Sequence, residues 1–187
     1  MKALLTLLLR TNDRIEPLLL RLFLGIVFFP HGAQKALGWF GGPGFAGTMG
    51  AFTQQMRIPA RLAFLAIAAE FAGPLGLILG LLTRVAAFGI FANMLVAVAM
   101  VHRKVGFFMN WSGTQKGEGF EFHLLAIGMA LALMRAGGGK LSADRALADP
   151  LAASPSDEAQ KGQIPTKVRR ATQEFVQPLL RQGLARG

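Results

Sequence analysis

The sequence contains no cysteine among its 187 residues. This absence excludes disulfide bonds and thiol–disulfide exchange from the chemistry of the chain. It also excludes iron–sulfur clusters and zinc sites that are ligated by cysteine. Any redox chemistry must therefore take its electrons from a partner protein or from a bound cofactor.

Charged residues are also scarce, at 16% of the chain against 52% hydrophobic residues, and the mean hydropathy is +0.43. A soluble domain has about a quarter charged residues, so this composition indicates a membrane protein. The net charge of +10 would suggest nucleic-acid binding in a soluble protein. Here nine of the twenty basic residues lie at or after Arg135, beyond the apolar region, which favours a membrane surface over nucleic acid.

The most informative stretch is residues 62–83, in which Glu70 is the one ionisable side chain. As a helix, its 22 residues would span roughly 33 Å, enough to cross a bilayer core of about 30 Å. A carboxylate at that depth must be protonated, pair with a cation or face a polar cavity. Its helix face also carries small residues that suit close helix packing, namely Ala63, Ala66 and Gly73. We expect Glu70 to point into a helix bundle, in a structural ion pair or a functional site.

Three further apolar stretches predict membrane-spanning helices at residues 17–37, 85–101 and 120–136. A glycine-rich loop in the membrane interface is expected at residues 38–50, and a polar loop at residues 102–119. The predicted fold is therefore all-α, an antiparallel bundle of four transmembrane helices. Both ends of the chain are expected on the cytoplasmic side, as the positive-inside rule favours.

Two segments flank the predicted membrane domain, which covers residues 17–146. Residues 1–16 predict a cytoplasmic or interfacial segment and not a removed signal peptide, because no small-x-small cleavage site follows their apolar run. Residues 147–187 predict a flexible basic tail. In that tail, residues 166–184 have the pattern of a basic amphipathic helix, which would lie on anionic lipid or bind a partner; a disordered tail is the alternative.

Four antiparallel spans would bring several polar side chains to one end of the bundle. The residues expected there are Lys35, His31, His102, Glu121 and His123, with Glu70 deeper in the membrane. Arg21 is expected to reach either the lipid headgroups or Glu70. These groups predict a shared polar pocket. A metal ion or haem is the less favoured occupant, because no helix carries paired ligands such as His-x-x-x-His.

The same residues lie in motifs by which the chain resembles the DoxX family of small membrane proteins. The motifs, which extend over residues 14–146, are Arg21-x-x-x-Gly25, His31-Gly32-x-x-Lys35, Gly38-Trp39-Phe40-Gly41, Glu70-x-x-Gly73, Leu79-Gly80-Leu81-x-Thr83-Arg84, His102 with Gly106-Phe107-Phe108, Glu121 and Gly139-x-x-Ser142-x-Asp144. The resemblance implies a four-helix protein of the bacterial inner membrane, similar to subunits of quinone-linked oxidoreductases or of oxidative-stress complexes. It gives no role to the tail.

The first functional hypothesis is accordingly a quinone-interacting subunit of a membrane oxidoreductase, with quinone as the expected cofactor. The candidate catalytic residues are Glu70, Arg21 and His31. The candidate cofactor-binding residues are His31, Lys35, His102, Glu121 and His123, and no residue is assigned to a metal. Two alternatives stay open: a non-enzymatic scaffold that recruits a soluble partner through the basic tail, and a carrier for a small solute or lipid with Glu70 as its proton-coupled site.

Overall fold

The computed structural model describes residues 2–152, in which every regular element is helical. The chain divides into two compact units, residues 1–149 and 150–187, and the first unit contains all the features discussed below. The predicted amphipathic helix at residues 166–184, and with it the proposed partner-recruiting part of the tail, lies outside the described residues.

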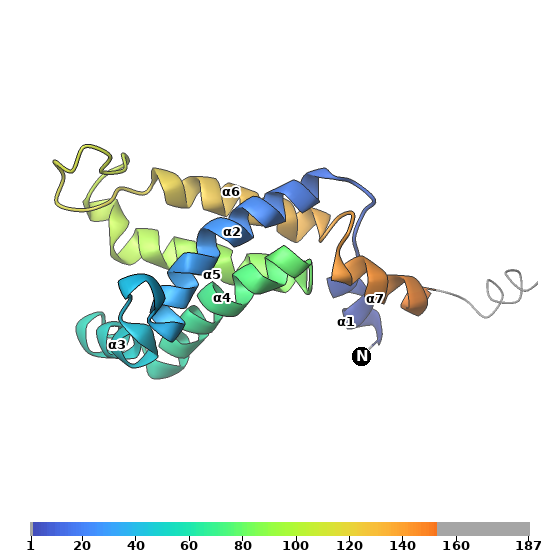
Figure 1. The fold of residues 1–187 in the computed structure, drawn as a ribbon, viewed down its shortest axis with the longest axis horizontal. Coiled ribbons are helices and arrows are strands. Elements are labelled where there is room, and N and C mark those ends of the chain that lie inside the picture. The colour runs from blue at the N-terminus through green and yellow to red at the C-terminus, as the bar shows by residue number, and fades with distance from the viewer. Residues whose placement is uncertain (1, 153–187) are drawn as a thin grey trace, which may run out of the picture. The chain divides into compact units, whose positions relative to one another are not determined.

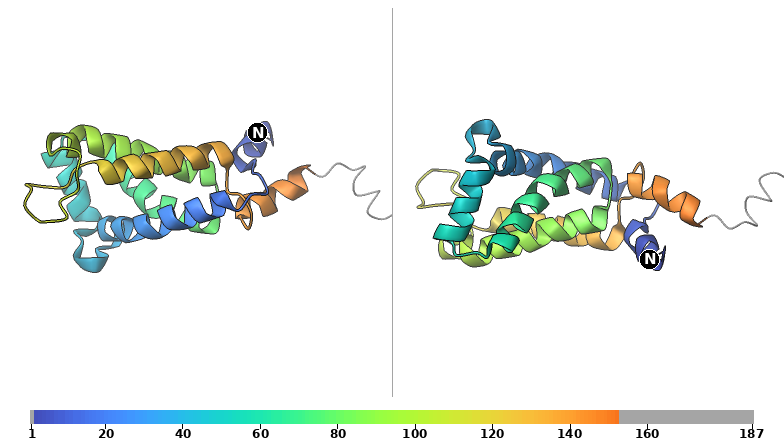
Figure 2. Two further views of the ribbon diagram at one scale, coloured as in Figure 1. Left: turned by 90° about the horizontal axis from the view of Figure 1, so that it is seen from above. Right: turned by 90° about the horizontal axis from the view of Figure 1, so that it is seen from below.

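Four long helices of the first unit run side by side (Figures 1 and 2). They are α2 (Glu16–Leu37), α4 (Ala60–Leu79), α5 (Thr83–Met100) and α6 (Glu121–Ala136). Helix α2 packs on α4, α4 on α5, α5 on α6, and α6 again on α2. Their shared core is apolar and includes Leu24, Phe28, Leu77, Ile90 and Leu133.

Helices α2, α4 and α5 are long and apolar enough to cross a membrane, which confirms that the described part of the chain contains several candidate membrane spans. Their outward-facing side chains are apolar as well, for example Phe23 and Leu65. Helix α6 has 16 residues and would extend about 24 Å, less than a bilayer core. The fourth span therefore stays a prediction.

The glycine-rich segment after α2 is helical, whereas a loop was expected. It contains the 3₁₀ turn η1 (Trp39–Gly41) and helix α3 (Gly44–Gly50), followed by the π-helical turn η2 (Ala51–Gln55). The Thr48 hydroxyl lies 2.8 Å from Gly44 O and 3.1 Å from Lys35 O, so it connects α3 to the end of α2. The Thr48 hydroxyl thus attaches to the end of α2 a segment whose glycines predicted a loop.

Three shorter helices complete the described chain. Helix α1 (Lys2–Leu9) precedes α2, the 3₁₀ turn η3 (His102–Lys104) follows α5, and α7 (Ala143–Ala152) follows α6. Helix α1 packs on α5, close to where α7 begins (Figure 1). Helix α7 runs through residue 146, where the membrane domain was predicted to end.

The closest approach of α2 to α4 is at Gly32. A Cβ atom at this position would overlap with the backbone carbonyl of Glu70, so the two helix backbones touch where Gly32 lacks a side chain. The contact is antiparallel, because Lys35 near the end of α2 pairs with Glu70, while Arg21 near its start reaches Leu77 and Ile78.

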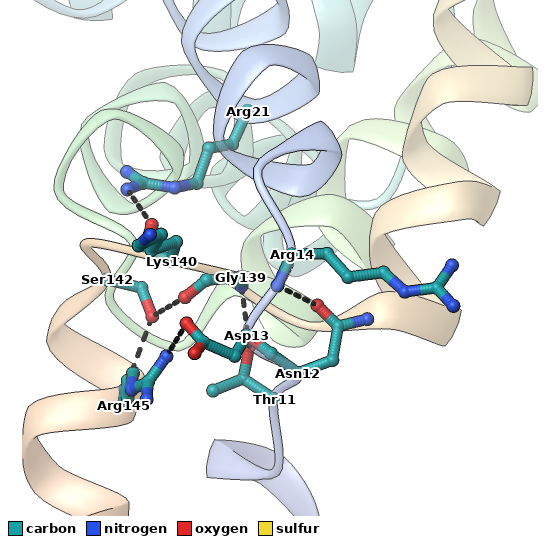
Figure 3. Close-up of polar contacts among 9 residues, drawn as sticks. All are labelled: Thr11, Asn12, Asp13, Arg14, Arg21, Gly139, Lys140, Ser142 and Arg145. Carbon is teal, nitrogen blue, oxygen red and sulfur yellow. Dashed lines mark hydrogen bonds and ion pairs between the residues drawn. The ribbon is translucent and has the colours of Figure 1, made fainter.

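Arg21 is 1% exposed and binds backbone carbonyls only. Its guanidinium donates to Leu77 O at 3.1 Å and Ile78 O at 2.6 Å in the last turn of α4. It also donates to Gly138 O at 3.1 Å, Leu141 O at 2.5 Å and Lys140 O (Figure 3). The last carbonyls of a helix lack partners in the following turn, and Arg21 supplies a donor to Ile78 O and a second donor to Leu77 O, which also accepts from Gly80 N at 3.1 Å.

Asp144, also 1% exposed, binds backbone amides at the start of α5, whereas Arg21 binds backbone carbonyls at the end of α4. Its carboxylate accepts hydrogen bonds from Leu82 N at 2.6 Å and Thr83 N at 2.9 Å. A negative charge at these first amide groups stabilises the helix start. Between the two sites, Gly80 ends α4 with φ = 66°, and a Cβ there would lie 2.6 Å from the Ser142 side chain. We call Arg21, Asp144 and the backbone groups they bind the turn network.

The turn network predicts that Asp144→Asn lowers the free energy of unfolding by about 1–3 kcal/mol, because an amide group would face a buried N–H donor. The matched control is Asp13→Asn. Asp13 is exposed and pairs with Arg145, whose hydrogen bond holds the pKa of the Asp13 carboxyl below its usual value. An exposed ion pair adds little stability, so this control should unfold like the parent protein in thermal scans followed by circular dichroism. Equal loss in both variants would contradict the assignment.

The α2–α4 contact predicts that Gly32→Ala destabilises the protein by about 1–3 kcal/mol, because the added methyl group forces the two backbones apart. Gly128→Ala in α6 is the control, since a Cβ at Gly128 has no neighbour within 4 Å. Alanine is favoured over glycine inside a helix by about 0.5–1 kcal/mol, so this variant should be as stable as the parent or more so. Thermal unfolding in detergent measures both; an unchanged midpoint for Gly32→Ala would refute the close contact.

Candidate functional site

Glu70 lies on the buried face of α4 and forms an ion pair with Lys35 of α2. Glu70 is 7% exposed, which confirms the expectation that it points into the helix bundle. A buried carboxylate is stable only with a partner that offsets its loss of hydration. Lys35 provides that partner from the last turn of its helix, and its side chain remains partly exposed.

Arg21 was expected to reach either the lipid headgroups or Glu70, and it does neither, because it is buried and binds backbone carbonyls. Arg21 and Lys35 are separated by 14 positions of α2, or roughly 21 Å along the helix. Arg21 belongs to the turn network at the opposite end of α2, where backbone carbonyls occupy its donors. The positive charge beside Glu70 is therefore that of Lys35, a residue expected near this end but not assigned to Glu70.

His102 and His123 meet at the same end of the helices as Lys35. His102 lies in η3 after α5, and His123 lies in the first turn of α6. Their ring centroids are 4.0 Å apart, with an angle of 40° between the ring planes. His123 is also within electrostatic range of Lys35. We call Lys35, Glu70, His102 and His123 the polar cluster.

The hydrogen bonds of the two histidines leave nitrogen atoms available. His102 Nδ1 lies 2.8 Å from the backbone carbonyl of Glu118, and because a carbonyl only accepts, this nitrogen carries the proton. The Nε2 atom of the neutral ring then has a free lone pair. His123 is 7% exposed, and its Nδ1 has no hydrogen-bond partner among the described residues. An unpaired buried nitrogen is costly, so it marks a position where a ligand would gain a hydrogen bond.

His31 lies at the border of this arrangement. Its ring is exposed and contacts Phe28, with ring centroids 6.5 Å apart. Phe28 in turn stacks on Phe122, the neighbour of His123, at 5.8 Å. Two of the three histidines thus come together as the topology predicted, and the third is joined to them through two aromatic rings.

Glu121, a predicted cofactor-binding residue, uses one carboxylate oxygen to bind the loop that precedes α6. It accepts hydrogen bonds from Met109 N at 3.0 Å and from Trp111 Nε1 at 3.2 Å, both in the loop between η3 and α6. Glu118 likewise accepts from Asn110 N at 2.7 Å. These two carboxylates fix the loop that carries the carbonyl partner of His102. The sequence indicated no role for Glu118. Its carbonyl binds His102 and its carboxylate binds a backbone amide, and hydrogen bonds to backbone groups leave no pattern in the spacing of side chains.

The arrangement offers hydrogen-bonding and proton-exchanging groups next to an aromatic surface. No group of three histidine or carboxylate side chains within the described part of the chain is placed to hold a metal ion. The polar cluster is therefore suited to an organic ligand with oxygen acceptors, held by imidazole and ammonium groups and flanked by Phe28 and Phe122.

Comparison with known proteins gives one match. Residues 17–103 match the family model described as DoxX. No curated protein and no solved structure matches the chain. The matched segment contains α2, α4 and α5, and with them Lys35, Glu70 and His102 of the polar cluster. The resemblance carried by the motifs is thereby confirmed over the matched segment: residues 17–103 form a DoxX domain.

Proposed function

We propose that this chain is a quinone-interacting subunit of an oxidoreductase in the bacterial inner membrane. The observation that carries the proposal is the unpaired, buried Nδ1 of His123 beside His102 and the Lys35–Glu70 ion pair. A quinone head group presents two carbonyl acceptors on an apolar ring, and the polar cluster supplies donors beside stacked aromatic side chains. The family resemblance, which implies quinone-linked subunits, agrees with this chemistry.

In the proposed mechanism, the residues of the chain bind the head group and supply protons. The imidazole of His123 would donate a hydrogen bond to one carbonyl of a bound quinone. The Lys35–Glu70 pair would deliver one proton, and His102 would deliver the second after taking it up at Nε2. The bound quinone would supply the redox chemistry, which takes up two electrons and two protons on reduction. The electrons would come from a partner oxidoreductase or a bound cofactor, because the chain contains no cysteine to ligate an iron–sulfur cluster of its own.

The proposal also includes a fourth membrane-spanning helix and an orientation of the chain in the membrane. Helix α6 would cross the bilayer beside α5 despite its length of 16 residues, with local thinning of the membrane around it. Both ends of the chain would then lie in the cytoplasm, and the polar cluster would lie toward the opposite leaflet. This depth suits a quinone, whose head group reaches its sites from within the membrane.

The proposal predicts that quinone co-purifies with the protein and that His123→Leu lowers the amount recovered by about tenfold, the effect of losing one hydrogen bond worth about 1.4 kcal/mol. Solvent extraction followed by absorbance spectroscopy measures the quinone per chain. Asn93→Leu is the control, because Asn93 is a bundle amide that donates to Ala66 O at 2.8 Å and has no hydrogen bond to a member of the polar cluster. Absence of quinone from the parent protein, or equal recovery from both variants, would refute the proposal.

A second experiment separates a functional ion pair from a structural one. Lys35→Met alone should destabilise the protein by about 3–5 kcal/mol, because Glu70 then stays buried without a cation. The double variant Lys35→Met/Glu70→Leu removes both charges and should recover most of that stability in thermal unfolding. We expect the double variant to fold and to retain less quinone than the parent. If it retains quinone fully, the ion pair serves only helix packing.

A further inference from the structure

Four exposed basic residues gather at the end of the helices that bears the turn network. They are Arg10, Arg14, Arg135 and Lys140. The polar cluster uses none of them, and each lies either in the segment that joins α1 to α2 or around the end of α6. Their charge is therefore unexplained by the proposed quinone site.

The backbone holds these two segments against each other. Lys140 N donates to Arg14 O at 2.9 Å, and Gly139 N donates to the Thr11 hydroxyl at 2.5 Å. Arg84 extends the connection, because its guanidinium binds both Arg10 O, at 3.0 Å, and Met134 O. These contacts hold together the two segments that carry the four basic residues. The basic side chains of those four residues take no part in the contacts.

Within residues 2–152, none of these four side chains forms an ion pair; the two ion pairs there are Lys35–Glu70 and Arg145–Asp13. The Asp13 carboxylate is also within electrostatic range of Lys140, but its hydrogen bond is to Arg145. Asp144 is committed to the amides at the start of α5. Arg84 adds a further positive charge within electrostatic range of Arg10. Like charges held together in this way favour an anionic ligand.

Apolar side chains flank the basic residues and indicate the kind of anion. Helix α1, directly before Arg10, exposes Leu4 (61%), Leu5 (41%) and Leu7 (58%), while Leu9 is buried. Ile15, one position after Arg14, is exposed as well. The Arg14 side chain extends away from the backbone pairing at Gly139 (Figure 3). Exposed leucines beside exposed cations match the border between acyl chains and charged headgroups.

We propose that Arg10, Arg14, Arg135 and Lys140 form a binding site for the phosphodiester head group of an anionic phospholipid. The guanidinium groups of the two N-terminal arginines would bind phosphate oxygens in pairs of hydrogen bonds, and the Lys140 ammonium would contribute a point charge. The exposed leucines of α1 would contact the acyl chains. This inference is independent of the proposed quinone site, which lies at the other end of α2.

The test uses the full chain in a neutral detergent, with thermal unfolding followed by circular dichroism as phosphatidylglycerol or phosphatidylcholine is added to the micelles. We expect phosphatidylglycerol to raise the unfolding midpoint and phosphatidylcholine to leave it unchanged. The variant Arg10→Gln/Arg14→Gln/Lys140→Gln should need on the order of 100-fold more phosphatidylglycerol, because each cation near an anionic lipid surface strengthens binding roughly fivefold. Its side chains make none of the backbone contacts above, so it should fold; Arg14→Gln alone gives a smaller shift in the same direction.

The matched control is Arg103→Gln/Lys104→Gln/Lys116→Gln, which removes the same charge from exposed residues at the other end of the helices. It should respond to phosphatidylglycerol like the parent protein. An equal loss of the response to phosphatidylglycerol in both triple variants would show that the response depends on net charge alone, and would refute the proposed site. An equal rise with inorganic phosphate would assign the site to a free anion, and no rise with phosphatidylglycerol would also refute the proposal.

Discussion

The antiparallel contact between α2 and α4 is the constraint on which both polar ends of the described structure depend. The contact is tight because Gly32 lies directly against the backbone of Glu70. One end of α2 then places Lys35 beside the Glu70 carboxylate, and the other places Arg21 at the last carbonyls of α4. In an apolar environment each of these charges would be prohibitive alone, so the register of the two helices and the pairing of their charges support each other.

The two polar ends differ in what their hydrogen bonds leave open. In the turn network, carbonyls occupy the donors of Arg21, and both oxygens of Asp144 accept from amides. Such saturation is typical of a structural site. The polar cluster keeps the buried Nδ1 of His123 without a partner among the described residues, and at the start of α5 the buried Thr83 hydroxyl is in the same state. The histidine end is the candidate site because its open atom belongs to an imidazole that lies beside a second imidazole and close to an ion pair.

The sequence predicted the helices and the inward position of Glu70 because both follow from local pattern and hydrophobic length. The meeting of His102 with His123 also followed, since antiparallel helices bring the end of one beside the start of the next. The partner of Arg21 could not be predicted, because its acceptors are backbone carbonyls that every residue carries. The same reason hid the roles of Asp144 and Glu118, and the bonds of Thr48 made helical a segment whose glycines suggested a loop.

The turn network also bears on where this domain ends. The family model stops at residue 103, yet Arg21 inside it binds carbonyls at positions 138–141, and the amides that begin α5 are capped by Asp144. A truncated protein that ended at residue 103 would leave the end of α4 and the start of α5 without these partners for their backbone groups. The shortest fragment that keeps the partners and the whole of α7 ends at residue 152, and a cut at the end of the family match would come some fifty residues too early.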